Sequence, residues 1–280
     1  MDSVAVGLVF HRAAPRPPIR SEPGLDVLVQ TNAADGERPT SWLGFGANHN
    51  LLLREAGDPD WYVALNPDVA AGADDIKRLV DAAEGAGIDV AGPLLDSPWG
   101  VGGPRPALPG PGQWLRETFG GARSAGRSGE LGVVRRSTWV SGACIALRLD
   151  RPEARFDEDY FMYFEDAALC HRVAEAGGRV GVCEQVLVSH RSGWSEQDPL
   201  RWRRGVEFAR SALRFAEQTN QSRQLMRAAG VVRFGSRRWV PGRSTSEDVG
   251  ARAIARGFVR VRRAPGLREL AADFNAGRGH

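Results

Sequence analysis

The 280-residue sequence has few of the residues that build disulfide-rich, metal-cluster or membrane proteins. Its three cysteines, Cys144, Cys170 and Cys183, are odd in number and far apart, which excludes a disulfide framework and a zinc cluster and indicates small buried apolar residues. No apolar run approaches the length of a membrane span. The first residues, 1–6, lack the basic region of a secretory signal, so the sequence predicts a cytoplasmic protein.

Lysine is almost absent, because Lys77 is the only one and arginine supplies nearly all of the positive charge. We attribute this bias to codon usage and not to function. The net charge is only +3, but the chain from Arg201 onward is rich in arginine and has few acids. Such a segment either contacts phosphates of lipid or nucleic acid or forms a solvated helical face, and the solvated face is the simpler interpretation.

Apolar runs and helical patterns alternate along most of the chain. The predicted elements are strands at 4–10, 25–30, 61–65 and 88–94, helices at 44–56 and 74–86, strand-like sequence at 133–149, a helix at 169–177, strands at 179–183 and 186–189, and a helix at 200–218. Strands that alternate with helices favour an α/β fold with a largely parallel sheet. Residues 96–132 are dense in Gly, Pro, Ser and Arg and predict a long loop, which is either a functional flap or a disordered segment.

Residues 156–170 combine acidic and aromatic side chains in a way that a plain surface helix does not need. Five acidic residues lie close to five aromatic ones just before a helical pattern. Aromatic side chains shield a carboxylate from water, which raises its pKa and suits it to act as a general base. Composition alone leaves five candidates for that carboxylate: Asp157, Glu158, Asp159, Glu165 and Asp166.

Two polar motifs follow predicted strands. Asp68, in Asn66-Pro67-Asp68, comes directly after a buried strand, and ligands of open α/β sheets bind at the carboxyl ends of strands. A carboxylate there suits Mg²⁺ or Mn²⁺ bound together with a substrate phosphate, although Asn-Pro-Asp is also a good turn sequence. His190 follows a short strand and is either a metal or phosphate ligand or a hydrogen-bonded structural residue.

Small residues at a predicted helix start form a third motif. Gly44, Gly46 and Asn50 either bring the backbone close to a nucleotide or allow close packing. A dinucleotide fingerprint is absent, because no G-x-G-x-x-G follows the first strand.

The order of these motifs resembles the family 2 glycosyltransferases, and most of all their rhamnosyltransferase-like branch. The stretches that match in type and order are Leu43-Gly44-Phe45-Gly46-Ala47-Asn48-His49-Asn50, Leu65-Asn66-Pro67-Asp68, Gly142-Ala143, Phe164-Glu165-Asp166 and then His190. The resemblance covers about residues 3–217. It implies a GT-A fold, a Rossmann-like α/β architecture with a mostly parallel central sheet flanked by helices. The chain then divides into a GT-A domain, 1–219, and an Arg-rich helical C-terminal extension, 220–280.

The resemblance also implies a chemistry. It predicts an inverting transfer of a sugar, rhamnose or another hexose, from a nucleotide-diphosphate sugar to an acceptor hydroxyl, with Mg²⁺ or Mn²⁺ as cofactor. Asp166 would be the general base with Glu165 beside it, and Asp68 and His190 would hold the metal. The implied donor-binding residues are Thr31, Asn32, Gly44, Gly46, Asn50, Asn66, Asp68, Gly142 and Ala143. Residues 157–159 would be a solvated lead-in, and the aromatics of 161–164 would line the acceptor side.

Two departures from the family pattern leave other hypotheses open. Thr31 stands where relatives usually have an acidic residue that helps hold the nucleoside, and a proline-rich segment follows the first strand in place of a helix. A catalytically weak, GT-A-like nucleotide-sugar-binding or scaffold protein is therefore the second hypothesis. A nucleic-acid-binding protein is the third and is disfavoured, since no recognised motif accompanies the arginines.

The sequence does not choose among several partners. A saccharide, a lipid-linked or a small-molecule acceptor would each suit the predicted enzyme. The extension at 220–280 would pair two subunits, cover the acceptor site or lie on an anionic membrane as a peripheral contact.

Overall fold

The computed structural model describes most of the chain. The described ranges are 3–10, 17–31, 42–97, 100–105, 107–118, 134–191, 198–236, 245–262 and 266–275.

A single mixed sheet forms the centre of the molecule. Its strands are β1 (Val4–Phe10), β2 (Leu25–Thr31), β3 (Trp61–Leu65), β4 (Val69–Ala70), β5 (Val90–Ser97), β6 (Gly100–Gly102), β7 (Val134–Arg136), β8 (Cys144–Arg148) and β9 (Val180–His190). Their order is β2-β1-β3-β8-β5-β9-β4, with β6 beside β5 and β7 beside β9. The long strands β2, β1, β3, β5 and β9 share one direction, and β8 runs against its neighbours β3 and β5. The predicted architecture, a mostly parallel sheet flanked by helices, is confirmed.

Eight helices accompany the sheet within the described ranges. They are α1 (Phe45–Glu55), α2 (Ala73–Gly85), α3 (Pro111–Thr118), α4 (Glu165–Glu175), α5 (Arg201–Gln218), α6 (Arg223–Ser236), α7 (Thr245–Arg260) and α8 (Leu267–Asn275). Both faces of the sheet are covered, so β1 and β3 are buried along their whole length and consist largely of apolar residues. The two apolar clusters on either side of the sheet together make up the core of this part of the molecule.

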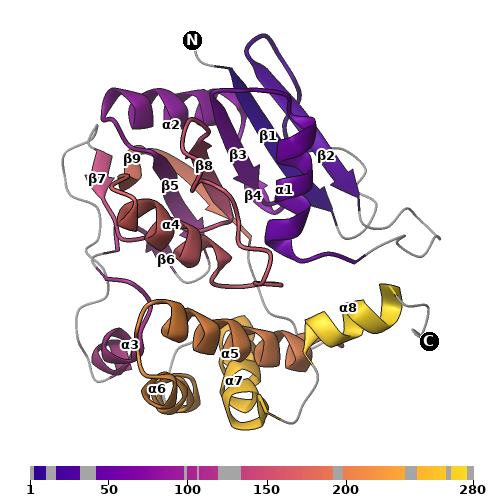
Figure 1. Cartoon of the computed structure of the whole chain (residues 1–280), viewed down its shortest axis with the longest axis vertical. Coiled ribbons are helices and arrows are strands. Elements are labelled where there is room, and N and C mark those ends of the chain that lie inside the picture. Colours follow the sequence, from indigo (N-terminus) through magenta and orange to yellow (C-terminus); the bar gives the residue numbers. More distant parts are fainter. Residues whose placement is uncertain are drawn as a thin grey trace.

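The parallel strands place their carboxyl ends on one edge of the sheet, facing the layer of α3, α5, α6 and α7 (Figure 1). In the register of these strands Phe10 lies beside Thr31, and Leu8 lies beside Leu65. Thr31 and the turn that starts at Asn66 are therefore on the same edge. This is the edge at which ligands bind in open α/β sheets.

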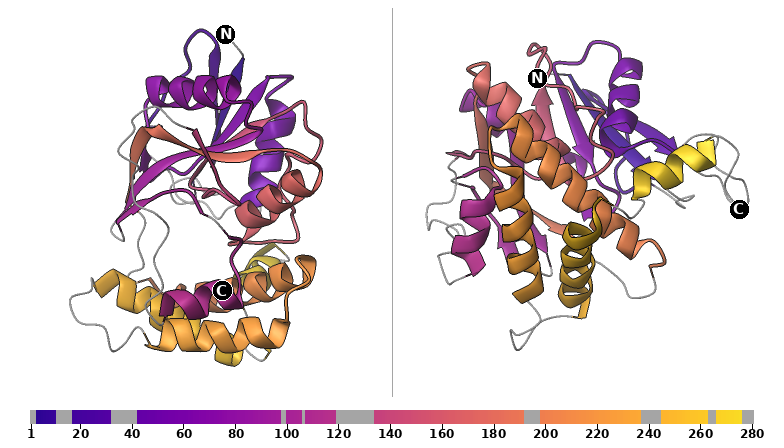
Figure 2. Two further views of the ribbon diagram at one scale, coloured as in Figure 1. Left: turned by 90° about the vertical axis from the view of Figure 1, so that its left-hand side faces the viewer. Right: turned by 60° about the horizontal axis from the view of Figure 1, so that its bottom comes forward.

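The helical layer forms below that edge as a second compact unit (Figure 2). Its core is aromatic, since Trp114 of α3 contacts Phe208 of α5, Phe234 of α6 and Phe258 of α7. Helices α5 and α7 cross closely at Gly205 and Gly257, where a side chain on either glycine would overlap the backbone of the other helix. The described parts of residues 220–280 form α6, α7 and α8, in agreement with the predicted helical extension, and α6 and α7 pack directly on α5. The domain boundary at 219/220 remains a prediction.

Two details differ from the sequence prediction. Part of the segment 96–132 is ordered, with β6 and α3 inside it, because Pro111 opens a helix whose Trp114 enters the aromatic core; residues 98–99, 106 and 119–132 lie outside the described ranges. The two short strands predicted at 179–189 are one long strand, β9, with a register shift opposite Pro93 and Leu94. The three cysteines are free and buried, as expected.

Candidate active site

A short strand pair brings Asp68 and His190 together. Asp68 precedes β4, whose Val69 pairs with His190 at the end of β9 in antiparallel register. The Asp68 carbonyl accepts a hydrogen bond from the Arg191 backbone N–H at 3.0 Å, which holds the two chain segments in place. As a result, the Nε2 atom of His190 lies 3.4 Å from the Oδ1 atom of Asp68.

The exposure and the charge of Asp68 and His190 suit a metal-binding site. The Asp68 side chain is 47% exposed, whereas that of His190 is 13% exposed, so the carboxylate faces the solvent-accessible side. Burial would raise the pKa of Asp68, but the hydrogen bond and charge of His190 and the charge of Arg204 outweigh it and lower the pKa. The carboxylate therefore stays ionised, as a ligand of a hard cation must be.

The described residues contain no cluster of three or more His, Cys, Asp or Glu side chains arranged to hold a metal ion. Two protein ligands nonetheless fit Mg²⁺ or Mn²⁺, because such ions keep several waters and complete their shell with substrate phosphate oxygens. Asp68 and His190 are close enough for one cation to contact both side chains.

The loop 141–143 links this edge to the second motif. The carbonyl of Ala143 accepts the backbone N–H of Asn66 at 2.8 Å. The backbone N–H of Gly142 donates to Oδ2 of Asp166 at 2.9 Å. Asn66, Gly142, Ala143 and Asp166 are therefore neighbours, as their predicted roles around one donor and one acceptor require.

The neighbouring acids Glu165 and Asp166 have different surroundings. Asp166 is half-buried and accepts the N–H groups of Gly142 and Ala167, whereas Glu165 is buried and its Oε2 atom has no hydrogen-bond partner in the described structure. Burial raises the pKa of Asp166 despite those two N–H groups and the charge of Arg105. Burial and the charge of Asp166 raise the pKa of Glu165 well above its ordinary value. Of the two, Asp166 is the one equipped to carry the negative charge of a base.

An unusual backbone turn presents these acids. Tyr163 and Phe164 both have left-handed conformations, with φ of 71° and 66°. Such values are costly for aromatic residues and persist where the surrounding packing fixes them. Here Phe164 packs in the aromatic core, and the Tyr163 hydroxyl accepts a hydrogen bond from Nε of Arg204 at 3.1 Å. The turn ends in α4, so Glu165 and Asp166 occupy its first turn.

Two arginines near the site were not predicted from the sequence. The guanidinium of Arg105 stacks on Trp139, 4.3 Å from the ring centroid, and its positive charge acts on Asp166. Arg204 of α5 donates to Tyr163 and to Asp198, and its charge acts on Asp68. Arg105 lies in the Gly- and Pro-rich segment and Arg204 in an Arg-rich helix, so neither stands out in the sequence.

The remaining predicted donor residues divide into two groups. Thr31 is exposed at the end of β2 on the site edge, and Asn32 lies outside the described residues. Gly44, Gly46 and Asn50 instead pack against residues 156–161. The Asn50 side chain donates a hydrogen bond to the carbonyl of Phe156 at 2.9 Å and accepts one from its backbone N–H at 3.1 Å. Their contact with a donor remains a prediction.

The two glycines can be tested through stability. A Cβ atom on Gly44 would lie 2.6 Å from the Phe161 carbonyl oxygen, and one on Gly46 would lie 2.7 Å from Cβ of Phe156. We expect Gly44→Ala and Gly46→Ala each to lower the free energy of unfolding by about 1–3 kcal/mol, measured by urea denaturation. Gly85→Ala is the matched control, because nothing lies within 4 Å of its Cβ position. Equal stability of all three variants would contradict the packing role.

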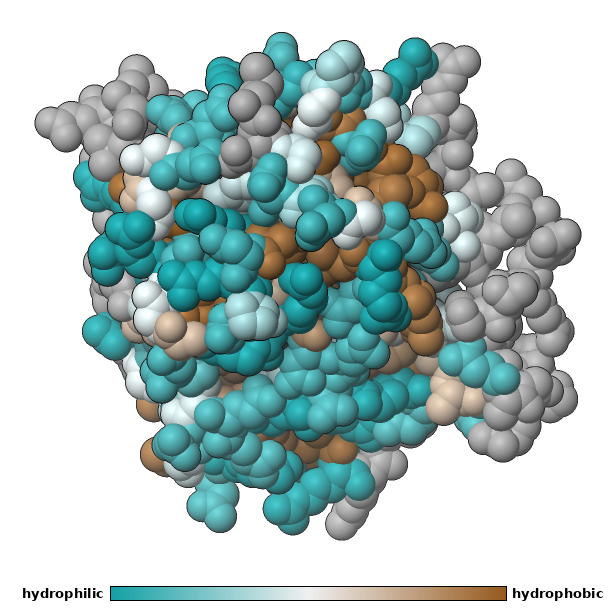
Figure 3. All heavy atoms as spheres, turned by 45° about the horizontal axis from the view of Figure 1, so that its top comes forward, coloured by the Kyte–Doolittle hydropathy of each residue, from teal (hydrophilic) through white to brown (hydrophobic). Residues whose placement is uncertain are grey.

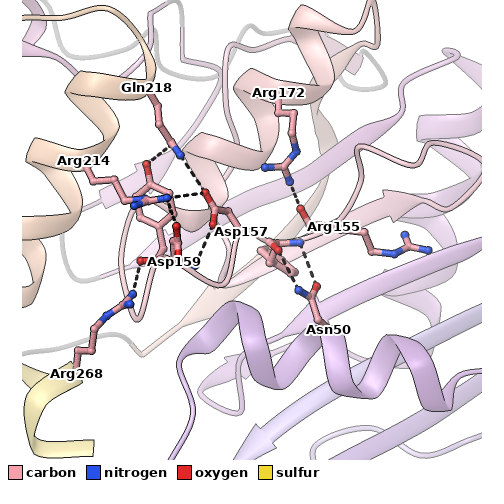
Figure 4. Close-up of polar contacts among 10 residues, drawn as sticks. Asn50, Arg155, Asp157, Asp159, Arg172, Arg214, Gln218 and Arg268 are labelled. Atoms are coloured by element: carbon pink, nitrogen blue, oxygen red, sulfur yellow. Dashed lines mark hydrogen bonds and ion pairs between the residues drawn. The ribbon is translucent and has the colours of Figure 1, made fainter. Parts of the chain in front are cut away.

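The segment before α4 is in part a solvated lead-in, as predicted, because Glu158 and Asp159 are exposed, but it is also a structural junction (Figure 4). Gln218 of α5 donates to Asp157 at 3.0 Å, and Arg214 forms an ion pair with Asp159. Arg268 of α8 donates to the carbonyl of Asp159. The carboxylates of this segment therefore tie the sheet domain to the helical layer.

The aromatics of this segment are also largely structural. Phe161 is buried against Leu267 and Ala271 of α8, and Phe164 is buried in the aromatic core. Burial leaves both rings unable to line an acceptor pocket, so that prediction is wrong for them. Tyr163 is half-buried and accepts a hydrogen bond from Arg204, and its place in an acceptor pocket stays a prediction.

Sequence comparison finds relatives for part of this chain. No protein-family model matches the chain. The N-acetylglucosaminyl-diphospho-decaprenol L-rhamnosyltransferase of Mycobacterium tuberculosis, in strains CDC 1551 / Oshkosh and ATCC 25618 / H37Rv, is 32% identical over 186 residues, which cover 56% of this chain and 59% of the relative. Over that part, the chain is similar to a rhamnosyltransferase. Since it matches little more than half the length of these relatives, their activity and substrates are proposals for it.

Solved glycosyltransferase structures show only a loose overall likeness to this rhamnosyltransferase-like chain. The mannosyltransferase PcManGT from Pyrobaculum calidifontis, in complex with GDP-Man and Mn²⁺, has a TM-score of 0.49 at 13% identity and covers 99% of this chain and 74% of its own. GalNAc-T7 with UDP, GalNAc and Mn²⁺ has a TM-score of 0.47 at 13% identity, covering 98% and 57%. Scores this low do not assign roles to individual residues.

None of the helices within the described ranges combines the length and apolar character that crossing a membrane requires.

Proposed function

We propose that the chain is an inverting, metal-dependent glycosyltransferase that moves a sugar, rhamnose or another hexose, from a nucleotide-diphosphate sugar to an acceptor hydroxyl. One observation supports this most directly. The loop 141–143 contacts both the Asn66 turn, through Ala143, and the candidate base Asp166, through Gly142. A donor held at Asp68 and an acceptor held at Asp166 would therefore meet across this loop.

The donor side of the reaction rests on Asp68 and His190. These two side chains would hold Mg²⁺ or Mn²⁺, which would neutralise the charge that develops on the departing diphosphate. Asn66, Gly142 and Ala143 lie beside this pair, and Thr31 lies on the same edge for contact with the nucleoside. Arg204 adds a positive charge near Asp68, which favours an anionic donor.

The acceptor side rests on Asp166. Its carboxylate would take the proton of the acceptor hydroxyl while that oxygen forms a bond to the anomeric carbon of the donor sugar. The bond from that carbon to the diphosphate oxygen breaks at the same time, and its electron pair leaves with the nucleoside diphosphate. A single displacement inverts the anomeric centre and needs no covalent enzyme intermediate. Glu165 would remain neutral beside the base.

The acceptor proposal comes from the relatives. Their name describes transfer to an N-acetylglucosaminyl-diphospho-decaprenol, so a lipid-linked saccharide is the acceptor class that we propose for this chain. Division into a GT-A domain at 1–219 and an extension at 220–280, and pairing of two subunits, are retained as proposals.

A donor screen tests the proposed function. UDP-, dTDP- and GDP-sugars are incubated with the protein and Mn²⁺, with and without a lipid-linked saccharide, and the released nucleoside diphosphate is measured. We expect one donor class to be consumed, and EDTA to abolish its consumption. Binding of a donor without turnover by any acceptor, together with unchanged behaviour of Asp166→Asn, would instead favour the catalytically weak binding or scaffold protein that Thr31 suggests.

The charge of Arg105 gives a prediction about pH. The base works only when Asp166 is ionised, and its pKa is already raised by burial, while Arg105 opposes that rise. Arg105→Met removes this cation and should raise the pKa of Asp166 further. The acid limb of the profile of kcat against pH should therefore move to higher pH. Arg116→Met, which removes a cation from the exposed face of α3, is the control and should leave the limb in place. An unshifted limb in Arg105→Met would exclude this role.

A further inference from the structure

A hollow with a basic lining lies on the helical layer, away from the candidate active site. It has a volume of about 420 Å³ and is formed by α5, α6 and the end of α7. Leu213 and Val261 are its buried apolar lining residues. The charged lining consists of one acid, Glu217, and five arginines: Arg210, Arg214, Arg223, Arg227 and Arg262.

The arginines retain donors for an anion. Arg210, Arg214 and Arg223 form ion pairs with Glu269, Asp159 and Glu217. Arg227 donates to the carbonyls of Phe258 and Val259, at 2.9 Å and 3.1 Å, where α7 ends. A guanidinium has five N–H donors in a plane, so the ion pair of Arg223 and the two hydrogen bonds of Arg227 leave other donors available to phosphate oxygens.

Exposed apolar side chains lie on the two helices that border the hollow. Leu225 of α6 is 60% exposed and follows the lining residue Gln224, and Val259 of α7 is 58% exposed and lies two residues before the lining residue Val261. Val232 lies two turns beyond Leu225 on the same side of α6 and is also exposed. By contrast, the face shown in Figure 3, with the top of the molecule turned forward, is mostly hydrophilic. Large exposed apolar residues on the same helices as a basic hollow indicate a surface for an amphipathic partner.

Positive charge is concentrated in the C-terminal part of the chain, which contains α6 and α7. Residues 220–280 contain 13 arginines and four acids, a net charge of +9, whereas residues 1–219 have a net charge of −6. On the exposed side of α7, Arg252, Arg256 and Arg260 repeat at intervals of four residues. These arginines supply positive charge on the outer side of α7, which anionic lipid headgroups attract.

We propose that the α6–α7 face is a membrane-docking surface, in which the basic hollow binds phosphate headgroups of anionic phospholipids while Leu225, Val232 and Val259 enter the interface. A lipid bilayer is favoured over nucleic acid because the apolar residues would gain nothing from a nucleic-acid backbone. The proposal does not depend on the reaction, although an enzyme with a lipid-linked acceptor would gain access to it in this way.

Vesicle co-sedimentation of the full chain tests the proposal. The protein should bind phosphatidylcholine vesicles that contain phosphatidylglycerol, should bind pure phosphatidylcholine weakly, and should be released as NaCl is raised. The double variant Arg223→Gln/Arg262→Gln should bind roughly 30-fold more weakly, the effect expected from removing two cations at an anionic surface. Arg54→Gln/Arg78→Gln, an equal change of charge at exposed positions of α1 and α2, should bind like the wild type.

Variants of the apolar residues distinguish membrane docking from charge attraction alone. Leu225→Asn/Val259→Asn keeps the net charge but should bind more weakly, whereas Val101→Asn/Leu187→Asn, at exposed positions of the sheet, should not. No binding of the wild type to anionic vesicles, or an equal loss in both control pairs, would overturn the proposal. So would tight binding to DNA that the Leu225/Val259 variant leaves unchanged. Nucleotide release from the donor is measured without vesicles, so failure here is distinguishable from failure of the proposed function.

Discussion

Asp166→Asn is expected to lower kcat for sugar transfer by about 10²- to 10⁴-fold, the range for loss of a general base. Asparagine has the same shape but cannot take up the acceptor proton. Its side-chain oxygen can still accept an N–H group of Gly142 or Ala167, so the start of α4 should keep its structure. Initial rates of nucleotide release at saturating donor and acceptor give kcat, and thermal unfolding shows that the fold is retained.

Glu165→Gln is the matched comparison for this result. Burial and the neighbouring charge raise the pKa of Glu165 so far that a neutral side chain already occupies the position. Glutamine should therefore reduce kcat much less than the change at Asp166 does. If Glu165→Gln removed activity and Asp166→Asn retained it, the base would be Glu165 and the assignment would be wrong.

Asp68→Ala should weaken binding of the donor's nucleoside diphosphate in the presence of Mn²⁺ by at least about 10- to 100-fold, the range seen when a metal site is disturbed. His190→Ala should act in the same direction. Because both side chains would hold one ion, the double variant should lose little more than Asp68→Ala alone. Isothermal titration with the nucleotide, with Mn²⁺ or with EDTA, measures these effects.

The metal assignment also predicts how the wild type should respond to EDTA. EDTA should weaken its nucleotide binding to the level of Asp68→Ala and should leave the variant unchanged. Asp74→Ala, which removes an exposed carboxylate from the first turn of α2, is the control and should bind like the wild type. Binding that is equally tight with Mn²⁺ and EDTA would exclude a metal at Asp68 and His190.

The fold was largely predictable because its signals are local. The strands 4–10 and 61–65 are continuous apolar runs, and the structure places β1 and β3 there with the same bounds. Helix α3 was missed although Pro111 and Trp114 mark it, because the glycines and prolines around them indicate a loop. The direction of β8, opposite to its neighbours, also has no local signal, since side-chain alternation is the same in parallel and antiparallel strands.

The candidate site was predictable in its members but not in its geometry. Asp68 and His190 were chosen through the resemblance, yet the feature that joins them is the two-residue strand β4, too short to leave a pattern. The difference between Glu165 and Asp166 comes from the backbone N–H groups of Gly142 and Ala167, which exist only once the chain has folded. Arg105 reaches Asp166 for the same reason.

The hydrogen bond between Gly142 and Asp166 affects how this protein's descendants could change. Asp166 joins a loop to the first turn of a helix, where a negative or polar side chain is favourable whether or not any reaction takes place. A lineage that lost its activity would therefore still be selected, for stability alone, to keep a side chain that accepts hydrogen bonds at this position. An aspartate or asparagine at this position therefore shows that the junction between loop and helix is intact. Only a measurement of proton transfer by this side chain would show that it is catalytic.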